Sequence, residues 1–363
     1  MTAVVDCCVD EGWASVEELL PYLSEGWRDF VGQPGSLPGG GGSRPVMPRA
    51  SWQPTVADDA GDAFQATVAP AISDPAALAA AWLEPHGIEL AVLTHGMARM
   101  TPAMVHPHYA RALGAAVNDW MLERWLEDDR SGRLRGAIVI PEQVAEWAVE
   151  EIARVGDHPK VAAVLLGAGT GRTAGHPSLD PVYRAASEHG LAVMLYAGGD
   201  AVQDTLGSPT AGGAPSVHAE LEILAAQRLM FDLGSLIAGG TFERHPELRI
   251  ILAGGGFTWL PGYLWRLDMG YKGLRTDAPW LTRLPSEYVL DHVRIVAAPL
   301  DRTEPAAMER IVGAYPQLRD LVCFGSGFPG RARATPAEAE MRLGSLWSPQ
   351  VRGETARAVL RLT

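Results

Sequence analysis

The chain has 363 residues, of which 47% are hydrophobic, as expected of a globular protein with a full core. Its 43 acidic and 30 basic residues give a net charge of -13, which argues against a nucleic acid as the main partner. Three cysteines cannot build a disulfide framework, so we expect a reducing, cytoplasmic location. No apolar run reaches the roughly 20 residues of a membrane span, and acidic residues stand where a signal peptide has basic ones.

The first predicted strand, residues 4–10, is a short apolar run with several β-branched residues. These features favour a buried parallel strand. Alternation places Asp6, Cys8 and Asp10 on one face, which points toward the axis in a closed barrel. Because the C-terminal ends of barrel strands carry the chemistry, the end of this strand is the first place to expect a site.

A capping-box pattern at Ser15 and Glu18 predicts a short helix through Leu20 and Tyr22. Residues 33–73 then form an irregular insertion, rich in glycine and proline. The length of the insertion leaves two interpretations open, a flap over the barrel mouth and a loop exposed to solvent.

Regular alternation of strands and helices begins near residue 74. Further strands are predicted at 88–94, 136–140, 161–166, 191–196, 248–253, 293–298 and 321–324. Helices are predicted at 74–82, 109–125, 144–155, 181–189, 217–237, 257–269 and 304–315, and two more helical patterns close the chain. Eight strand–helix units predict a (β/α)8 TIM barrel, an α/β fold, as one domain over residues 1–363. The alternative is a doubly wound open sheet, but the first strand lacks the phosphate-binding fingerprint of that fold.

Several stretches, in order along the chain, resemble the amidohydrolase-2 group of the metal-dependent amidohydrolase superfamily. They lie at 5–10 with 19–23, 118–120, 181–186, 240–249, 259–261 with 265–268, and 324–329. This group includes decarboxylases related to aminocarboxymuconate semialdehyde decarboxylase. The resemblance implies an amidohydrolase-like barrel with a divalent metal at its mouth, which activates water or polarises the substrate.

The positions that hold the metal in this group carry other residues here. The group uses an Asp/His-x-His pair on strand one, a His ending strand five and an Asp ending strand eight. In this chain Cys8 and Asp10 occupy the pair, Tyr196 and Gly327 stand at the other two positions, and Gly254 replaces a Glu after strand six. Since a zinc site needs about three protein ligands or more, we predict no family-type metal site and no cofactor. A rebuilt site with Cys8, Asp10 and a distant histidine is the alternative.

The candidate catalytic residues are polar side chains expected near the barrel mouth. Asp10 is a candidate general base, and His95 titrates near neutral pH. Tyr196 is a candidate hydrogen-bond donor, Cys8 a candidate nucleophile, and His218 lies near the sixth strand. The structural alternatives are that the Asp10 carboxylate pairs with a nearby arginine, that the Tyr196 ring fills the space of the absent metal, and that the buried Cys8 thiol packs as a small hydrophobic group.

The candidate substrate-binding residues are Trp13, Arg172 and His176. Trp13 follows the first strand, and the other two lie in a Gly-rich loop after the fourth strand, which suits an anion or a carboxylate. His106 and His108 have a ligand-like spacing but precede a helix, so we interpret them as surface residues.

Three functions are compatible with these patterns. The first is a non-catalytic or supporting subunit in a homo- or hetero-oligomer with a metal-containing amidohydrolase relative, because the segment around Trp259 and Trp265 remains recognisable while the ligand positions have changed. The alternative is a metal-independent hydrolase or lyase, decarboxylase-like, that uses acid–base residues on a small carboxylated or aromatic metabolite. The third is small-molecule binding without turnover. A nucleic acid or a membrane is not expected as a partner.

Overall fold

The computed structural model describes residues 3–12, 16–31, 72, 74–96, 101, 104, 106–168, 172–197, 218–301, 303–330 and 332–362. Within helix α6 the side chains of residues 218–224 are outside this description, as is that of residue 274. The predicted insertion at 33–73, apart from residue 72, therefore lies outside the described residues, as does the candidate Trp13.

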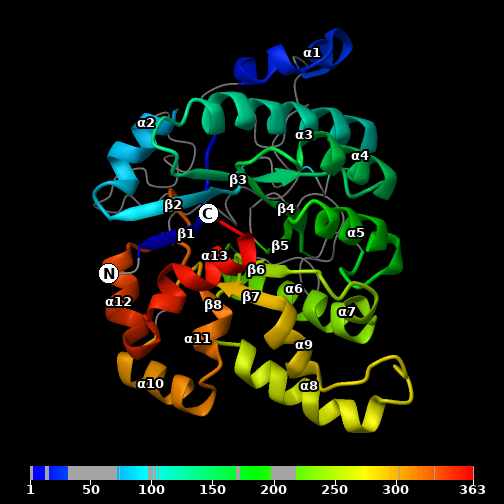
Figure 1. The fold of residues 1–363 in the computed structure, drawn as a ribbon, viewed down its shortest axis with the longest axis vertical. Coiled ribbons are helices and arrows are strands. Elements are labelled where there is room, and N and C mark those ends of the chain that lie inside the picture. The colour runs from blue at the N-terminus through cyan, green and yellow to red at the C-terminus, as the bar shows by residue number, and fades with distance from the viewer. Residues whose placement is uncertain are drawn as a thin grey trace.

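The described residues form one sheet of eight parallel strands, ordered β1 to β8 as in the sequence (Figure 1). The strands are β1 (Val4–Val9), β2 (Ile88–Leu93), β3 (Leu134–Val139), β4 (Val161–Gly167), β5 (Ala192–Tyr196), β6 (Ile250–Ala253), β7 (Val293–Val296) and β8 (Val322–Cys323). Backbone bonds close the ring, because Cys7 N donates to Phe324 O at 3.0 Å and Asp10 N donates to Phe328 O at 2.7 Å. The predicted (β/α)8 barrel is confirmed.

Helices surround the strands, and α1 lies at the outer edge of the molecule beyond α3 (Figure 1). The helices are α1 (Glu25–Val31), α2 (Pro75–Leu78), α3 (Pro107–Met121), α4 (Ala145–Val155), α5 (Asp180–Glu188), α6 (His218–Ala238), α7 (Thr241–Arg244), α8 (Leu260–Leu274), α9 (Pro285–His292), α10 (Pro305–Ala314), α11 (Leu318–Leu321), α12 (Pro336–Leu343) and α13 (Thr355–Leu360). Short 3₁₀ or π segments extend or link them at Val16–Glu18, Leu20–Tyr22, Ala79–Leu83, Leu122–Glu127, Pro177–Leu179, Gly344–Leu346 and Gln350–Glu354.

Several helices begin at a proline, whose missing N–H costs nothing in the first turn and whose fixed φ suits a helix start. Pro75 begins α2, where the Asp74 carboxylate also accepts a hydrogen bond from Ala77 N at 2.8 Å. Pro336 begins α12 inside a capping box made by Thr335 and Glu338. Proline thus marks where these helices start along the chain.

Four helices, α1, α7, α9 and α11, were not predicted from the sequence. The helix α9 has Pro285 in its first turn, and the Glu287 carboxylate accepts from Leu284 N at 2.7 Å. The helix predicted after the first strand is instead two 3₁₀ turns, Val16–Glu18 and Leu20–Tyr22, which are followed by the unpredicted α1.

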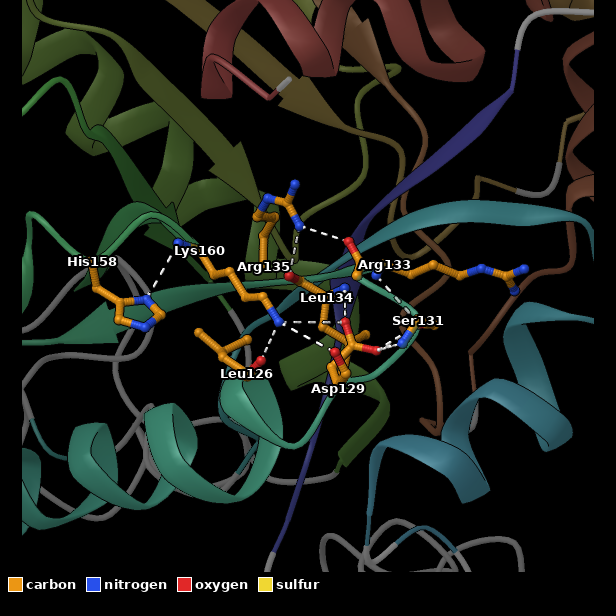
Figure 2. Close-up of polar contacts among 9 residues, drawn as sticks. Leu126, Asp129, Ser131, Arg133, Leu134, Arg135, His158 and Lys160 are labelled. Atoms are coloured by element: carbon orange, nitrogen blue, oxygen red, sulfur yellow. Dashed lines mark hydrogen bonds and ion pairs between the residues drawn. The ribbon is translucent and has the colours of Figure 1, made fainter.

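A polar network fixes the N-terminal ends of β3 and β4 (Figure 2). The buried Asp129 carboxylate accepts from Ser131 N at 2.9 Å, from the Ser131 hydroxyl at 2.5 Å and from Leu134 N at 2.9 Å. The Lys160 ammonium donates to the carbonyl of Leu126 and lies 4.0 Å from Asp129 Oδ2. In this fold the N-terminal end of the barrel serves stability rather than chemistry.

We expect Asp129→Ala to lower the free energy of unfolding by about 2–4 kcal/mol, because it removes several hydrogen bonds from buried donors at once. Urea unfolding measures the change. The control is Asp157→Ala, since the Asp157 side chain is 83% exposed and pairs only with the ring of His189; its cost is expected to stay within about 1 kcal/mol. Equal costs for the two variants would contradict a structural role for Asp129.

Candidate functional site at the barrel mouth

The C-terminal ends of β1, β2 and β5 bring four polar side chains to one end of the barrel. Cys8 lies in β1 and Asp10 just beyond it, Thr94 directly follows β2, and Tyr196 is the last residue of β5. Cys8 and Thr94 are fully buried, whereas Asp10 and Tyr196 are partly exposed. Three of the predicted residues, Asp10, Cys8 and Tyr196, therefore meet in space.

These four residues form a continuous series of polar contacts, which we call the mouth chain. The Thr94 hydroxyl donates to Asp10 Oδ1 at 2.7 Å. Thr94 Oγ1 lies 3.8 Å from Cys8 Sγ, and Cys8 Sγ lies 3.2 Å from the Tyr196 hydroxyl oxygen. Since Thr94 gives its proton to Asp10, its oxygen can accept from the Cys8 thiol, whose sulfur can accept from Tyr196. The contacts are therefore compatible with donors that run from Tyr196 toward the Asp10 carboxylate.

Asp6 does not join the mouth chain, and the expected shared face of Asp6, Cys8 and Asp10 is wrong. The pairing of β1 with β2 shifts register between Asp6 and Val9, and a one-residue shift moves side chains to the other face. The Asp6 carboxylate accepts from the indole N–H of Trp82 at 3.3 Å and from Ser326 N at 2.8 Å. Burial raises the pKa of Asp6 to about 6, although these hydrogen bonds act in the opposite direction.

His95 is buried against Glu11, a residue that the sequence analysis missed. His95 Nδ1 lies 2.5 Å from Glu11 Oε1, and His95 N donates to Glu11 Oε2 at 3.1 Å. Nδ1 and Oε1 are in close contact, although they do not have the alignment of a hydrogen bond. His95 also has a φ of 50°, in the left-handed region that residues other than glycine seldom adopt.

The loop after β4 places its two predicted residues on protein partners. Arg172 donates to the carbonyl of Glu142 at 2.8 Å and to the Ser178 hydroxyl at 2.7 Å, which ties the loops after β3 and β4 together. His176 is exposed and its ring also contacts Ser178, at 2.8 Å. A cavity of about 10 Å³ lies between Arg172, Glu142 and Leu195, room for a single water. No contact joins Arg172 or His176 to the mouth chain among the described residues.

The remaining predicted residue, His218, is the first residue of α6. Its side chain is outside the described part of the structure. His218 and Trp13 therefore remain predictions.

Two glycines at this end of the barrel have conformational reasons to be glycine. Gly327 has a φ of 69° and its N–H donates to Cys8 O at 3.0 Å, which joins the loop after β8 to β1. Gly254 has a φ of 84°, and a Cβ there would lie 2.5 Å from Ala197 O and 2.8 Å from the Tyr196 ring. The Tyr196 ring thus packs against a position that has no room for a side chain.

The described residues do not fit the divalent-metal site that the family resemblance implies. Within the described ranges, no three His, Cys, Asp or Glu side chains are grouped so that they could hold an ion. Of the four positions that the resemblance predicts as metal ligands, Gly327 offers no side-chain donor, and Cys8 and Asp10 alone offer usual ligand atoms. A zinc site takes about three or four such ligands.

Cys7 and Cys323 are neighbours across the seam between β1 and β8. Their hydrogen bond, together with burial, holds the pKa of the Cys7 thiol well above its ordinary value. Both thiols are free and fully buried. A buried neutral thiol pair is a structural element rather than a nucleophile.

The missed residues Thr94 and Glu11 each directly adjoin a residue that was predicted. Thr94 ends the predicted second strand next to His95, and Glu11 follows Asp10. A polar residue at the C-terminal end of a barrel strand was the available signal for both. Their partners are about 84 residues away in the sequence, and no local pattern reports such a pairing.

A barrel with polar side chains at the C-terminal ends of its strands is the architecture of many enzymes, including the amidohydrolases. The family model described as amidohydrolase matches residues 70–362. The chain therefore belongs to the amidohydrolase family. No curated protein matches the sequence, and no described helix is long and apolar enough to cross a membrane.

Several crystal structures share the fold. An amidohydrolase from Mycobacterium avium subsp. paratuberculosis has a TM-score of 0.74 at 17% identity, covering 99% of this chain and 98% of that one. The 5-carboxyvanillate decarboxylase of Sphingomonas paucimobilis has a TM-score of 0.68 at 18% identity, covering 100% of both chains. The 5-carboxyvanillate decarboxylase of Novosphingobium aromaticivorans, with bound manganese and 3-methoxy-4-hydroxy-5-nitrobenzoic acid, has a TM-score of 0.64 at 18% identity, covering 99% and 97%. At such identities the likeness establishes the fold alone.

Proposed function

We propose that this protein is a metal-independent lyase of the decarboxylase type that acts on a small carboxylated aromatic metabolite. The observation that carries the proposal is the mouth chain, in which Tyr196, Cys8, Thr94 and Asp10 connect a phenol to a carboxylate at the catalytic end of the barrel. The decarboxylases among the structures of similar fold support the substrate class. The described residues at the barrel mouth offer few metal-ligand atoms, which supports catalysis by proton transfer.

Decarboxylation replaces a carbon–carboxylate bond with a carbon–hydrogen bond, so the substrate carbon must receive one proton as CO₂ leaves. The Tyr196 hydroxyl, at the outer end of the mouth chain, is the proposed donor to that carbon, and the phenolate that remains takes up a proton from water before the next turnover. Asp10 at the other end accepts a hydrogen bond from Thr94 and keeps the donors ordered. Positioned proton transfer of this kind typically contributes about 10²–10⁴-fold to a rate.

The test is CO₂ release by the purified protein from 5-carboxyvanillate and from 2,6-dihydroxybenzoate, the compounds named for the similar decarboxylases. We expect turnover of at least one of them, unchanged after dialysis against EDTA and without stoichiometric metal by mass spectrometry. Activity that disappears with EDTA and returns with manganese would refute the metal-independent proposal. A complete lack of turnover on aromatic carboxylates would refute the lyase.

A supporting subunit is the second candidate function, favoured by exposed apolar side chains on α6 and α8. Phe231 on α6 is 63% exposed, and Trp265 and Met269 on α8 are 52% and 63% exposed. The two helices are neighbours, because the Tyr263 hydroxyl donates to Met230 O at 2.5 Å. Large exposed apolar side chains on neighbouring helices can belong to a subunit contact. A protein that is monomeric by light scattering, alone and with a metal-containing family member, would exclude this candidate.

A further inference from the structure

The loops after β1 and β2 are joined side chain to side chain at two successive positions. Asp10 pairs with Thr94, and the next residues, Glu11 and His95, pair with each other. The proposed chemistry uses only the first pair. The second pair is more deeply buried, with side-chain exposures of 1% for His95 and 0% for Glu11.

Both oxygens of the Glu11 carboxylate contact His95, one at the backbone and one at the ring. Oε2 accepts from His95 N at 3.1 Å, and Oε1 lies 2.5 Å from Nδ1. These contacts hold His95 in the left-handed conformation, with a φ of 50°. Residues kept in such sparsely populated conformations cluster at functional sites, where the surrounding structure over-determines them.

The short contact fixes where the ring carries a proton. At 2.5 Å a bare Nδ1 would set its lone pair against a carboxylate oxygen, so Nδ1 is the protonated nitrogen. The other nitrogen, Nε2, is buried and makes no hydrogen bond to any of the residues that the structure describes. Buried polar atoms nearly always have a hydrogen-bond partner, so we expect Nε2 to have one as well, and a ligand atom can fill that role.

We propose that Glu11 and His95 form a carboxylate–imidazole dyad whose Nε2 accepts a hydrogen bond from a phenolic hydroxyl group of the aromatic ligand. Glu11 is the positioning residue, because it sets the tautomer and orientation of the ring without contacting the ligand. This inference rests on the proposed function for its ligand class. It adds a second polar contact point beside the mouth chain, since His95 directly follows Thr94.

Nitrogen NMR of the full-length protein labelled with ¹⁵N-histidine tests the dyad, with 2,6-dihydroxybenzoate as the probe. In the free protein we expect His95 to carry its proton on Nδ1, and the probe is expected to shift the Nε2 resonance of His95. His245, whose Nε2 lies 3.1 Å from Asp180 Oδ1, is the internal control and should not shift. The resonance is assigned by its loss in His95→Asn, a substitution chosen because asparagine tolerates a positive φ.

The positioning role of Glu11 is tested with Glu11→Gln, whose amide has one acceptor and cannot satisfy both the backbone N–H and the ring. We expect mixed His95 tautomers in this variant and a dissociation constant for the probe weaker by about 10- to 100-fold, as for loss of a charge-assisted hydrogen bond. His95→Asn should weaken binding similarly. Circular dichroism and thermal melts establish that both variants are folded.

A proton on Nε2 in the free protein, or a probe that binds without shifting Nε2 or fails to bind, would overturn the inference. The outcome is separable from that of the proposed function. A shifted Nε2 without CO₂ release refutes the lyase and leaves the dyad, whereas CO₂ release with an unshifted Nε2 refutes the dyad and leaves the lyase.

Discussion

Asp10→Asn should lower kcat/KM for CO₂ release by about 10²–10⁴-fold, the range typical for loss of a positioned acid–base group. Asparagine has the size of aspartate and its side-chain oxygen can still accept the Thr94 hydroxyl bond of 2.7 Å. It cannot hold a negative charge, and its amide can donate to Thr94 Oγ1 as well as accept from it, so the order of donors along the mouth chain is no longer fixed. Steady-state kinetics on the better of the two aromatic carboxylates measures the effect.

The matched control is Asp301→Asn. Asp301 lies beyond β7, and its Oδ2 accepts from Phe257 N at 3.0 Å and from Thr258 N at 3.1 Å. An amide oxygen can accept the same two bonds, so kcat/KM is expected to change by less than about threefold, the range of ordinary surface or loop substitutions. If Asp10→Asn is as active as the wild type, the mouth chain has no part in catalysis.

The second large effect concerns Asp6 and the dependence of stability on pH. The folded-state pKa of Asp6 is raised from 3.8 to about 6 by burial. The folded protein therefore binds this proton more tightly than the unfolded chain does. The free energy of unfolding should fall as the pH rises from about 4 to about 6, by roughly 3 kcal/mol in total, and this contribution then stays constant at higher pH.

Urea unfolding of the wild type and Asp6→Asn across this range isolates the contribution of Asp6 as the difference between the two curves. A neutral amide has no proton to gain, so the difference should change steadily from pH 4 to 6. Trp82→Phe is the complementary variant, because the indole hydrogen bond lowers the pKa of Asp6. Without this bond, the decrease in the free energy of unfolding should extend to higher pH. Parallel curves for the wild type and Asp6→Asn would contradict a raised pKa.

The strands were predictable because each is a short apolar run, and burial on both sides leaves that signal in the sequence. The predicted ends of β2 and β5 lie within one residue of Leu93 and Tyr196. The helix α9 was missed although Pro285 and Glu287 mark its start, since its eight residues carry only a weak apolar stripe. Short helices of this kind are stabilised by tertiary packing more than by their own sequence.

The site was less predictable because its contacts are made across the barrel. The position of Tyr196 at the end of β5 could be predicted, but its contact with Cys8 links residues 188 apart. The register shift in β1 has no sequence signature, and it separates Asp6 from Cys8. Glu11 was missed for a related reason, since its role depends on the backbone conformation of His95.

The seam between β1 and the residues after β8 has a consequence for biosynthesis. Ser326 N bonds to Asp6 across a sequence separation of 320 residues, and Gly327 N bonds to Cys8 O. While the chain is being translated, β1 has no partner on this side until the ribosome has released β8 and the residues that follow it. Loop closure over such a distance is slow, so a prematurely terminated chain exposes an apolar strand edge that invites aggregation or chaperone capture.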